Sequence, residues 1–230
     1  ECGSPKSSSL PRDMLLSYLQ GLFGTATASK VSQVVIAGGL VAKSQEDSLD
    51  GVRELDGFCY QLVHNTGIPV TILPGKDDPT TANWPQRPLH RALLPRSSSN
   101  LLHSAPNPAQ IKFDDTSMLV TDGTNVADLC RRNDSVTEME ALQQTLIYNH
   151  VCPTGPDSVP TVPHNETDPM VIQSIPKIYV AGNCNEFATR LVSVNDDDDT
   201  TRLVCLPKFI DTSIAVLVNV KSLNVQLLRF

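Results

Sequence analysis

The sequence predicts an α/β protein with a mixed sheet or two packed sheets, for two reasons. A strand, helix and strand pattern comes early in the chain, and a series of short strands joined by turns ends it. In addition, three apolar runs typical of buried strands each end in a glycine turn: residues 34–40 (VVIAGGL), 70–79 (VTILPGKDDP) and 178–183 (IYVAGN). Such turns gather along one edge of a sheet, where α/β proteins usually place a site.

The composition is that of a globular protein. The chain has 230 residues, 40% of them hydrophobic, and a net charge of −7, which argues against nucleic-acid binding through the whole surface but leaves a local basic patch open. No apolar run approaches the roughly 20 residues of a membrane helix, and the first residues do not resemble a signal peptide. Six cysteines are spread singly without a CxxC pair. We therefore expect an intracellular protein with free thiols, no zinc site and no membrane partner.

The first third of the chain predicts a helix and then a strand, helix and strand crossover. Residues 13–24 should form an amphipathic helix with Asp13 as its N-cap and a glycine at its end. A strand at 30–40 and a polar, mobile loop at 42–48 follow. From Leu49 onward, apolar residues recur every three or four positions, which predicts a helix packed on a sheet. The strands on either side of this helix should be parallel, with a right-handed connection.

The rest of the chain predicts a long loop, a hairpin, a helix and a run of strands. Residues 74–108 are rich in Pro, Ser and Asn, which indicates a long loop of the kind that serves as a binding surface. Apolar residues on both sides of Asp114-Asp115 indicate a hairpin. Ser135 and Glu138 form a capping-box pattern at the start of a helix. A proline-rich extended segment at 152–169 comes next, and strands are expected at 178–181, 190–194, 202–206, 214–220 and 225–230.

The strand ends lack most of the ligands that a two-metal hydrolase needs. Such a site requires Asp, His and Asn side chains on neighbouring strands, because carboxylates and imidazoles must bridge and flank two cations. The strand ends instead carry Gly38-Gly39-Leu40, Gly75-Lys76-Asp77-Asp78 and Gly182-Asn183-Cys184-Asn185. None has a histidine, and Lys76 adds a cation. Asp77 and Asp78 could be a general acid/base pair, but adjacent carboxylates in a turn more often cap backbone N–H groups.

Other polar residues give little support for catalysis. His90 and His103 lie in the long loop, where an exposed or hydrogen-bonded imidazole is expected, and His150 closes a helix. The aspartates at 196–199 resemble a calcium ligand run but lack the glycine and distal glutamate of an EF-hand loop. A solvated turn is therefore expected there.

Several segments, in their order and spacing, resemble the small (B) subunits of replicative DNA polymerases. They are VVIAGGLV, LPGKDDPT with WPQRPLH, GTNVADLCRR, HVCPTGPDSV, TDPMVI and YVAGN. The resemblance runs from residue 15 to residue 230. The turn Pro-Gly-x-x-Asp-Pro-Thr, followed by Pro-Gln-x-Pro-Leu-His, makes the chain most similar to the delta members of this alpha/delta/epsilon B-subunit family.

The resemblance implies a calcineurin-like metallophosphoesterase fold, two packed mixed β-sheets flanked by helices, that has lost its metal ligands. Residues 1–230 would form this domain, and the family's first ligand motif and its N-terminal oligonucleotide-binding-fold domain would be missing before residue 1. No metal, cofactor or catalytic residue is expected. The family's remaining motifs map onto the strand ends, so the vestigial site loops would comprise Gly38, Gly39, Gly75, Lys76, Asp77, Asp78, Gly182 and Asn183.

The resemblance also implies a function, that of a non-catalytic scaffold subunit of the DNA polymerase delta holoenzyme. It would link the C-terminal domain of the catalytic subunit to a further accessory subunit, in the nucleus, in DNA replication and repair. Trp84 and Leu89, in the long loop and expected to be exposed, would either anchor a partner or pin the loop to the core.

Two other functions stay open from the residues themselves. An active metal-dependent phosphodiesterase or nuclease would need ligands from Asp77, Asp78, Asn183 or His90. A direct DNA-binding module would need a basic stripe with interleaved aromatic residues. The six Phe, four Tyr and one Trp are scattered along the chain, so no sequence-specific DNA binding is expected.

Overall fold

The computed structural model describes residues 1–4, 9–24, 28–42, 48–163, 166–193 and 200–230. Of the expected loop at 42–48, residues 43–47 therefore lie outside the described residues. The aspartates at 196–199 lie wholly outside them. Within the described part of the chain, no helix is long and apolar enough to span a membrane.

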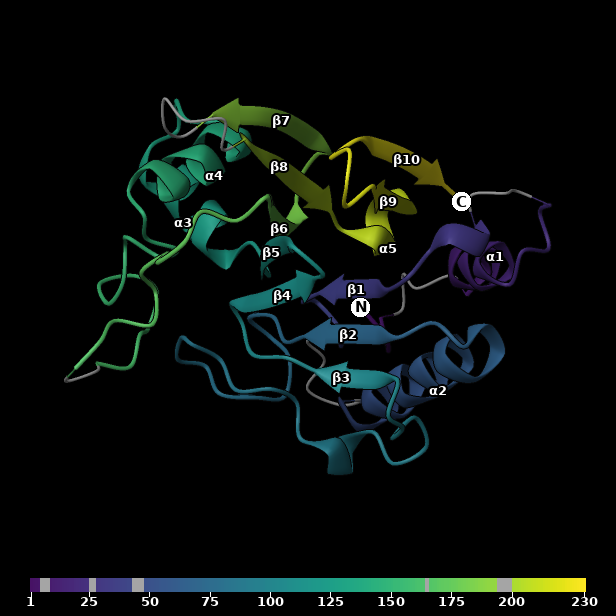
Figure 1. Ribbon diagram of the computed structural model, residues 1–230. Helices are drawn as coiled ribbons and strands as arrows, with labels where there is room; N and C mark the ends of the chain where they lie inside the picture. The colour runs from purple at the N-terminus through teal and green to yellow at the C-terminus, as the bar shows by residue number, and fades with distance from the viewer. Residues whose placement is uncertain (5–8, 25–27, 43–47, 164–165, 194–199) are drawn as a thin grey trace.

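The first sheet is parallel and contains three strands in the order β1 (Val34–Ala37), β2 (Val70–Leu73) and β3 (Leu102–Ser104). Helix α2 (Ser48–Thr66) connects β1 to β2 and packs on the sheet (Figure 1), so the predicted parallel crossover is confirmed. Strand β3 was not predicted. It lies inside the expected loop, and its three residues are too few to show an alternating pattern.

Helix α1 (Leu10–Leu19) packs beside α2 and begins earlier than predicted. Pro11 occupies its first turn, where a missing N–H has no effect on helical hydrogen bonding. Asp13 is consequently an acidic residue within the first turn and not the N-cap, which is Ser9.

The second sheet is mixed and has the order β4-β5-β6-β8-β7. Strands β5, β6 and β8 are parallel, and the antiparallel strands β4 and β7 form the borders. The predicted hairpin is confirmed, with Asp114 at φ 50° in its turn. The bounds are β4 Ala109–Phe113, β5 Thr116–Thr121, β6 Ile178–Cys184, β7 Ala188–Ser193 and β8 Thr200–Pro207.

The alternation along β5 and β6 shows how the layers pack. Leu119 and Tyr179 point toward α3 (Thr124–Arg132) and α4 (Glu138–Ile147), which cover one face of the second sheet (Figure 1). Met118 and Ile178 point the other way, into a core shared with Leu73 of the first sheet. The predicted fold class is thus confirmed: two sheets pack together and helices flank them.

Helix α4 begins with a capping box, but two residues later than predicted. Thr137 Oγ1 accepts a hydrogen bond from the Glu140 N–H at 3.3 Å, and Glu140 Oε2 accepts one from the Thr137 N–H at 2.9 Å. The Glu138 carboxylate instead accepts the Asn185 N–H at 3.0 and 3.1 Å. Ser135 therefore lies before the helix. The capping box forms at Thr137 and Glu140, a pattern that overlaps the predicted pair of Ser135 and Glu138.

The chain ends in α5 (Phe209–Thr212) and an antiparallel hairpin of β9 (Ile214–Val218) and β10 (Val225–Arg229). In Figure 1 this hairpin extends from the second sheet toward α1. Leu217, Leu228 and Phe230 pack against the core that α1 and α2 share with the first sheet. The hairpin therefore helps to join the two halves of the fold.

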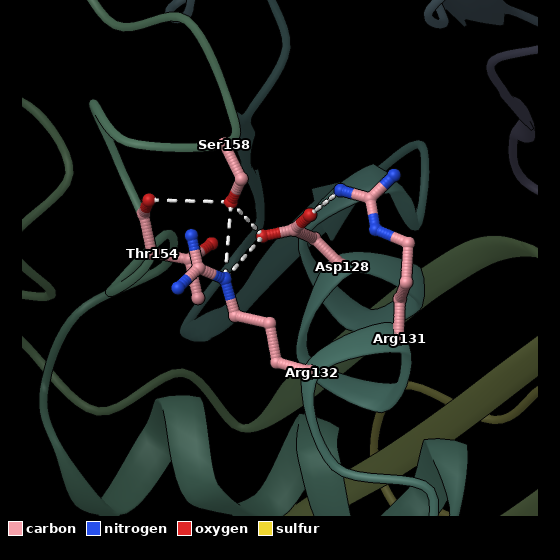
Figure 2. Close-up of polar contacts among 5 residues, drawn as sticks. All are labelled: Asp128, Arg131, Arg132, Thr154 and Ser158. Carbon is pink, nitrogen blue, oxygen red and sulfur yellow. Dashed lines mark hydrogen bonds and ion pairs between the residues drawn. The ribbon is translucent and has the colours of Figure 1, made fainter.

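The proline-rich segment after Cys152 is attached to α3 by a buried carboxylate (Figure 2). The Asp128 side chain is 2% exposed; it pairs with Arg131, accepts a hydrogen bond from Ser158, and lies 3.6 Å from Arg132 Nε. Burial alone would raise the pKa of Asp128, but the hydrogen bond from Ser158 and the charge of Arg131 outweigh it and lower the pKa.

Candidate functional site

The turns that follow β1, β2 and β5 meet the irregular last residues of β6 at one edge of the two sheets. We call them the strand-end loops; they comprise residues 38–39, 75–78, 122–123 and 182–183. Their backbones touch, because a Cβ on Gly38 would lie 3.1 Å from Gly75 Cα and a Cβ on Gly182 would lie 2.3 Å from the Ala37 carbonyl oxygen. Gly38 also has φ +72°, which L side chains rarely adopt. The predicted glycine turns are thus brought together, with no room for side chains between them.

Asp78 joins the first two of these loops. Its carboxylate accepts the N–H groups of Leu40 at 3.1 Å, Val41 at 2.8 Å and Gly75 at 2.6 Å. The side chain is 6% exposed. Of the two roles considered for Asp78, this geometry is that of a cap for backbone N–H groups.

Asp122, which directly follows β5, was not predicted from the sequence. Its carboxylate accepts the N–H of Lys76 at 3.1 Å, and the N–H and Oγ1–H of Thr124 at 3.1 and 2.6 Å. It therefore holds the β2 loop against the first turn of α3. A signal was present in the sequence, since Asp122 follows an apolar strand and precedes Gly123, as in the other strand-end loops.

Asn183 links the β6 loop to the end of β1 and to the loop after β5. Its side-chain Nδ2 donates to the Ala37 carbonyl at 3.2 Å and to the Asp122 carbonyl at 3.0 Å. The backbone of Asn183 has φ 49°, a conformation that asparagine tolerates better than most residues.

Two buried amides complete the network and were also missed. Gln86 Nε2 donates to the Gly75 carbonyl at 3.1 Å, and Asn107 Nδ2 donates to Gln86 Oε1 at 2.7 Å. Asn107 Oδ1 in turn accepts the Asp122 N–H at 3.2 Å. Gln86 is 1% exposed and Asn107 is 0% exposed, so both lie inside the fold although the sequence places them in the long loop.

Both carboxylates of the network have a raised pKa. Burial is the largest cause for Asp78 and for Asp122, and in Asp78 the nearby Asp122 charge adds to it. Backbone N–H groups oppose the shift, since they stabilise the ionised form. Both carboxylates therefore take up a proton more readily in this buried site than they would in water.

A two-metal centre, which the fold family implies, does not fit these residues. Asp78 and Asp122 direct their oxygens at N–H and O–H donors, and the loops offer no imidazole. Over all the residues that the structure describes, no three His, Cys, Asp or Glu side chains are grouped so that they could hold a metal ion. The arrangement is suited to joining strand ends.

The remaining candidate ligands lie outside the network. Lys76 and Asp77 are exposed at the surface of the β2 loop. His90 Nδ1 accepts the N–H of Ala92 at 3.2 Å within its own turn, and His150 Nε2 lies 3.0 Å from an Asp168 oxygen. Of the four residues that the phosphodiesterase alternative would need, the structure brings only Asp78 and Asn183 into the network.

Trp84 and Leu89 are buried, which corrects the expectation that they are exposed. Each is 2% exposed. Trp84 packs in the core beneath α4, and its backbone N–H donates a hydrogen bond to the Pro160 carbonyl at 2.8 Å. Leu89 packs in the core of the first sheet. The burial of both side chains favours the role of pinning the long loop to the core over that of anchoring a partner.

Comparison with known proteins identifies the family. Residues 6–189 match the family model that describes the B subunit of DNA polymerases alpha and epsilon. The chain is similar to the DNA polymerase delta small subunits of Oryza sativa subsp. japonica (31% identical, 99% of this chain and 57% of the relative) and Arabidopsis thaliana (31%, 99% and 55%). It is also similar to DNA polymerase delta subunit 2 of Drosophila melanogaster (34%, 83% and 44%). The chain spans about half the length of these curated relatives. The resemblance seen in the sequence is thereby confirmed, and the chain belongs to the DNA polymerase alpha/epsilon B-subunit family.

Proposed function

We propose that the chain is the inactive phosphoesterase-like domain of an accessory subunit of DNA polymerase delta. In this proposal it works in the nucleus, in DNA replication and repair, and links the C-terminal domain of the catalytic subunit to a further accessory subunit. Family membership and the names of the relatives support a role in a polymerase complex.

One observation carries the non-catalytic part of the proposal. Asp78 and Asp122 each accept three hydrogen bonds, some from their own turn and at least one from a different strand-end segment. A cation at these oxygens would have to displace the N–H groups, which would then be buried without acceptors, at about 1–3 kcal/mol each. The same bonds stabilise the edge where four strands end. The carboxylates therefore serve the rigidity of the domain, which suits a scaffold.

The proposal is tested by metal binding and turnover. Mn²⁺ is titrated into the purified chain by calorimetry, and hydrolysis of a generic phosphodiester and of single-stranded DNA is measured in parallel. We expect neither binding nor turnover. Stoichiometric Mn²⁺ binding, together with turnover that Asp77→Ala abolishes, would establish the phosphodiesterase alternative instead.

The linking role needs a separate test. The chain, within its full-length subunit, is co-expressed with the C-terminal domain of the catalytic subunit and with the further accessory subunit, first one at a time and then together. We expect each of the two partners to co-purify with the full-length subunit. The two partners should co-purify with each other only when the full-length subunit is present. Direct association of the other two subunits without it would refute the linking role.

A further inference from the structure

Strand β7 offers an open edge for a further strand. It borders the second sheet and, among the residues that the structure describes, pairs only with β8 (Figure 1). Its six residues, ATRLVS, include no Pro, Gly or Lys, and its one charged side chain, Arg190, is bonded to Gln143 of α4. Exposed edge strands usually carry such residues, or are very short, because their unpaired N–H and C=O groups can pair with another chain. By contrast, β3 has three residues, and β4 follows Pro108 and carries Lys112.

The two faces of β7 differ in a way that would select a partner strand. Ala188 and Val192 pack toward the core under α4, and Arg190 Nη1 donates to Gln143 Oε1 of that helix at 2.7 Å. Leu191 points to the opposite face, because side chains alternate along a strand, and it is 49% exposed. A strand added beside β7 would therefore meet α4 on one face and an exposed leucine on the other.

The charges on the α4 side of this edge are mostly negative, whereas Arg202 of β8 lies opposite Leu191 on the other face. Glu138 and Glu140 lie in the first turn of α4, and Glu186 is exposed two residues before β7 begins. The Glu138 carboxylate is fixed by the backbone N–H of Asn185. Arg190 is the single basic residue within β7. A basic partner strand would complement these carboxylates, whereas a second copy of the chain would bring the same carboxylates again.

We propose that an extended segment of a partner protein pairs with residues 189–192 of β7 as an additional strand of the second sheet. The segment carries a Lys or Arg that faces Glu140 and an apolar residue beside Leu191. Backbone hydrogen bonds supply the affinity and these two side chains supply the selectivity. This inference rests on the proposed function, since it names a surface through which the domain would hold another subunit.

Hydrogen exchange of the assembled complex tests the pairing directly. The full-length subunit is measured alone and then with the C-terminal domain of the catalytic subunit and with the further accessory subunit, each added separately. We expect one of them to slow exchange of the outward-facing amides of residues 189–192 by roughly tenfold or more, as new strand hydrogen bonds would. The amides that already bond to β8 serve as an internal control.

Proline substitutions provide the matched variants. Of Arg190 and Leu191, one directs its N–H toward β8 and the other directs it to the open edge, because neighbouring residues of an antiparallel strand alternate. The proline variant at the outward position should keep its melting temperature and bind roughly tenfold more weakly. The variant at the inward position should melt lower. Arg190→Ala separates loss of the side chain from loss of the N–H.

Each outcome decides the inference. Slower exchange in β7 on assembly, with weaker binding of the outward proline variant, supports it. A complex that assembles normally, with unchanged exchange in β7 and full binding by both proline variants, overturns it and leaves the proposed function standing. Concentration-dependent protection of β7 in the subunit alone would identify a second copy as the occupant and overturn it. Failure of the unmodified subunit to associate with either partner overturns both proposals.

Discussion

Replacing Asp78 by alanine should destabilise the domain strongly, although the residue looks like a catalytic acid in the sequence. The substitution removes the acceptors of three backbone N–H groups, from Leu40, Val41 and Gly75, at 3.1, 2.8 and 2.6 Å. These groups lie at a buried meeting point of two loops, so no neighbouring acceptor replaces the carboxylate.

The expected magnitude follows from the hydrogen bonds. A buried N–H that loses its partner costs about 1–3 kcal/mol, and water entering the vacated space brings the value toward the lower end. The three groups together give a loss of about 3 kcal/mol in the free energy of unfolding. Burial raises the pKa of Asp78, which means that burying the ionised carboxylate costs free energy. The alanine variant avoids this cost, and that offsets part of the loss. Asp78→Asn keeps one oxygen and should lose about half as much.

Urea unfolding at neutral pH measures the effect, with the fluorescence of Trp84 as reporter. This residue is the single tryptophan of the chain and is 2% exposed. Asp77→Ala is the matched control, because Asp77 is the adjacent carboxylate and is exposed; its change should stay within about 0.5 kcal/mol. Equal, small changes in both variants would refute the assignment of Asp78 as a structural cap.

Three further predictions concern other parts of the fold. Urea unfolding from about pH 2 to 7 should separate two carboxylates. Burial raises the pKa of Asp122, so the contribution of this carboxyl to stability is lost as pH rises; Asp122→Asn loses a hydrogen-bond acceptor of the loops, but its stability relative to the parent should rise with pH. The pKa of Asp128 is lowered, so its contribution is lost as pH falls, and Asp128→Asn should be most damaging near pH 7; parallel pH profiles for both variants would contradict this. Gly182→Ala places a Cβ 2.3 Å from a β1 carbonyl oxygen and should lose about 2–3 kcal/mol in the same assay, while Gly57→Ala in α2, whose nearest neighbour would be 3.9 Å away, should be neutral or stabilising. Trp84→Ala removes the fluorescent reporter, so its unfolding is followed by circular dichroism; the free energy of unfolding should fall by about 3–5 kcal/mol, and pull-down of the catalytic subunit's C-terminal domain should be unchanged. Loss of binding by a variant that stays folded would restore a partner-anchoring role.

The sequence predicted the elements whose signals are local. The crossover from β1 through α2 to β2 follows from a period of 3.6 between two apolar runs, and the β4–β5 hairpin from apolar residues around a turn. Helix α3 was not predicted, because its inward side carries the polar residues Asn125 and Asp128, each buried with partners that come from distant segments. Their fit depends on tertiary contacts that no short window of sequence contains.

The same reason explains what was missed at the strand-end loops. The glycine turns were visible, since a glycine after an apolar run is a local pattern. The groups that hold the turns together were not, because Gln86 and Asn107 belong to a long loop whose path brings them back under the turns. Polar residues in a proline-rich loop are usually assigned to the surface. Here both side chains are at most 1% exposed.

The strand-end loops also show why carboxylates at strand ends do not by themselves indicate catalysis. Glycine turns that touch one another leave buried N–H groups, and each of these needs an acceptor. A carboxylate can accept several such bonds at once, so Asp78 and Asp122 satisfy a requirement that the packing of the loops creates. An active centre would need the opposite arrangement, with oxygens directed into an open space and imidazoles beside them. The direction in which the oxygens point, rather than the number of acidic residues, therefore favours a structural role for Asp78 and Asp122 at this edge of the fold.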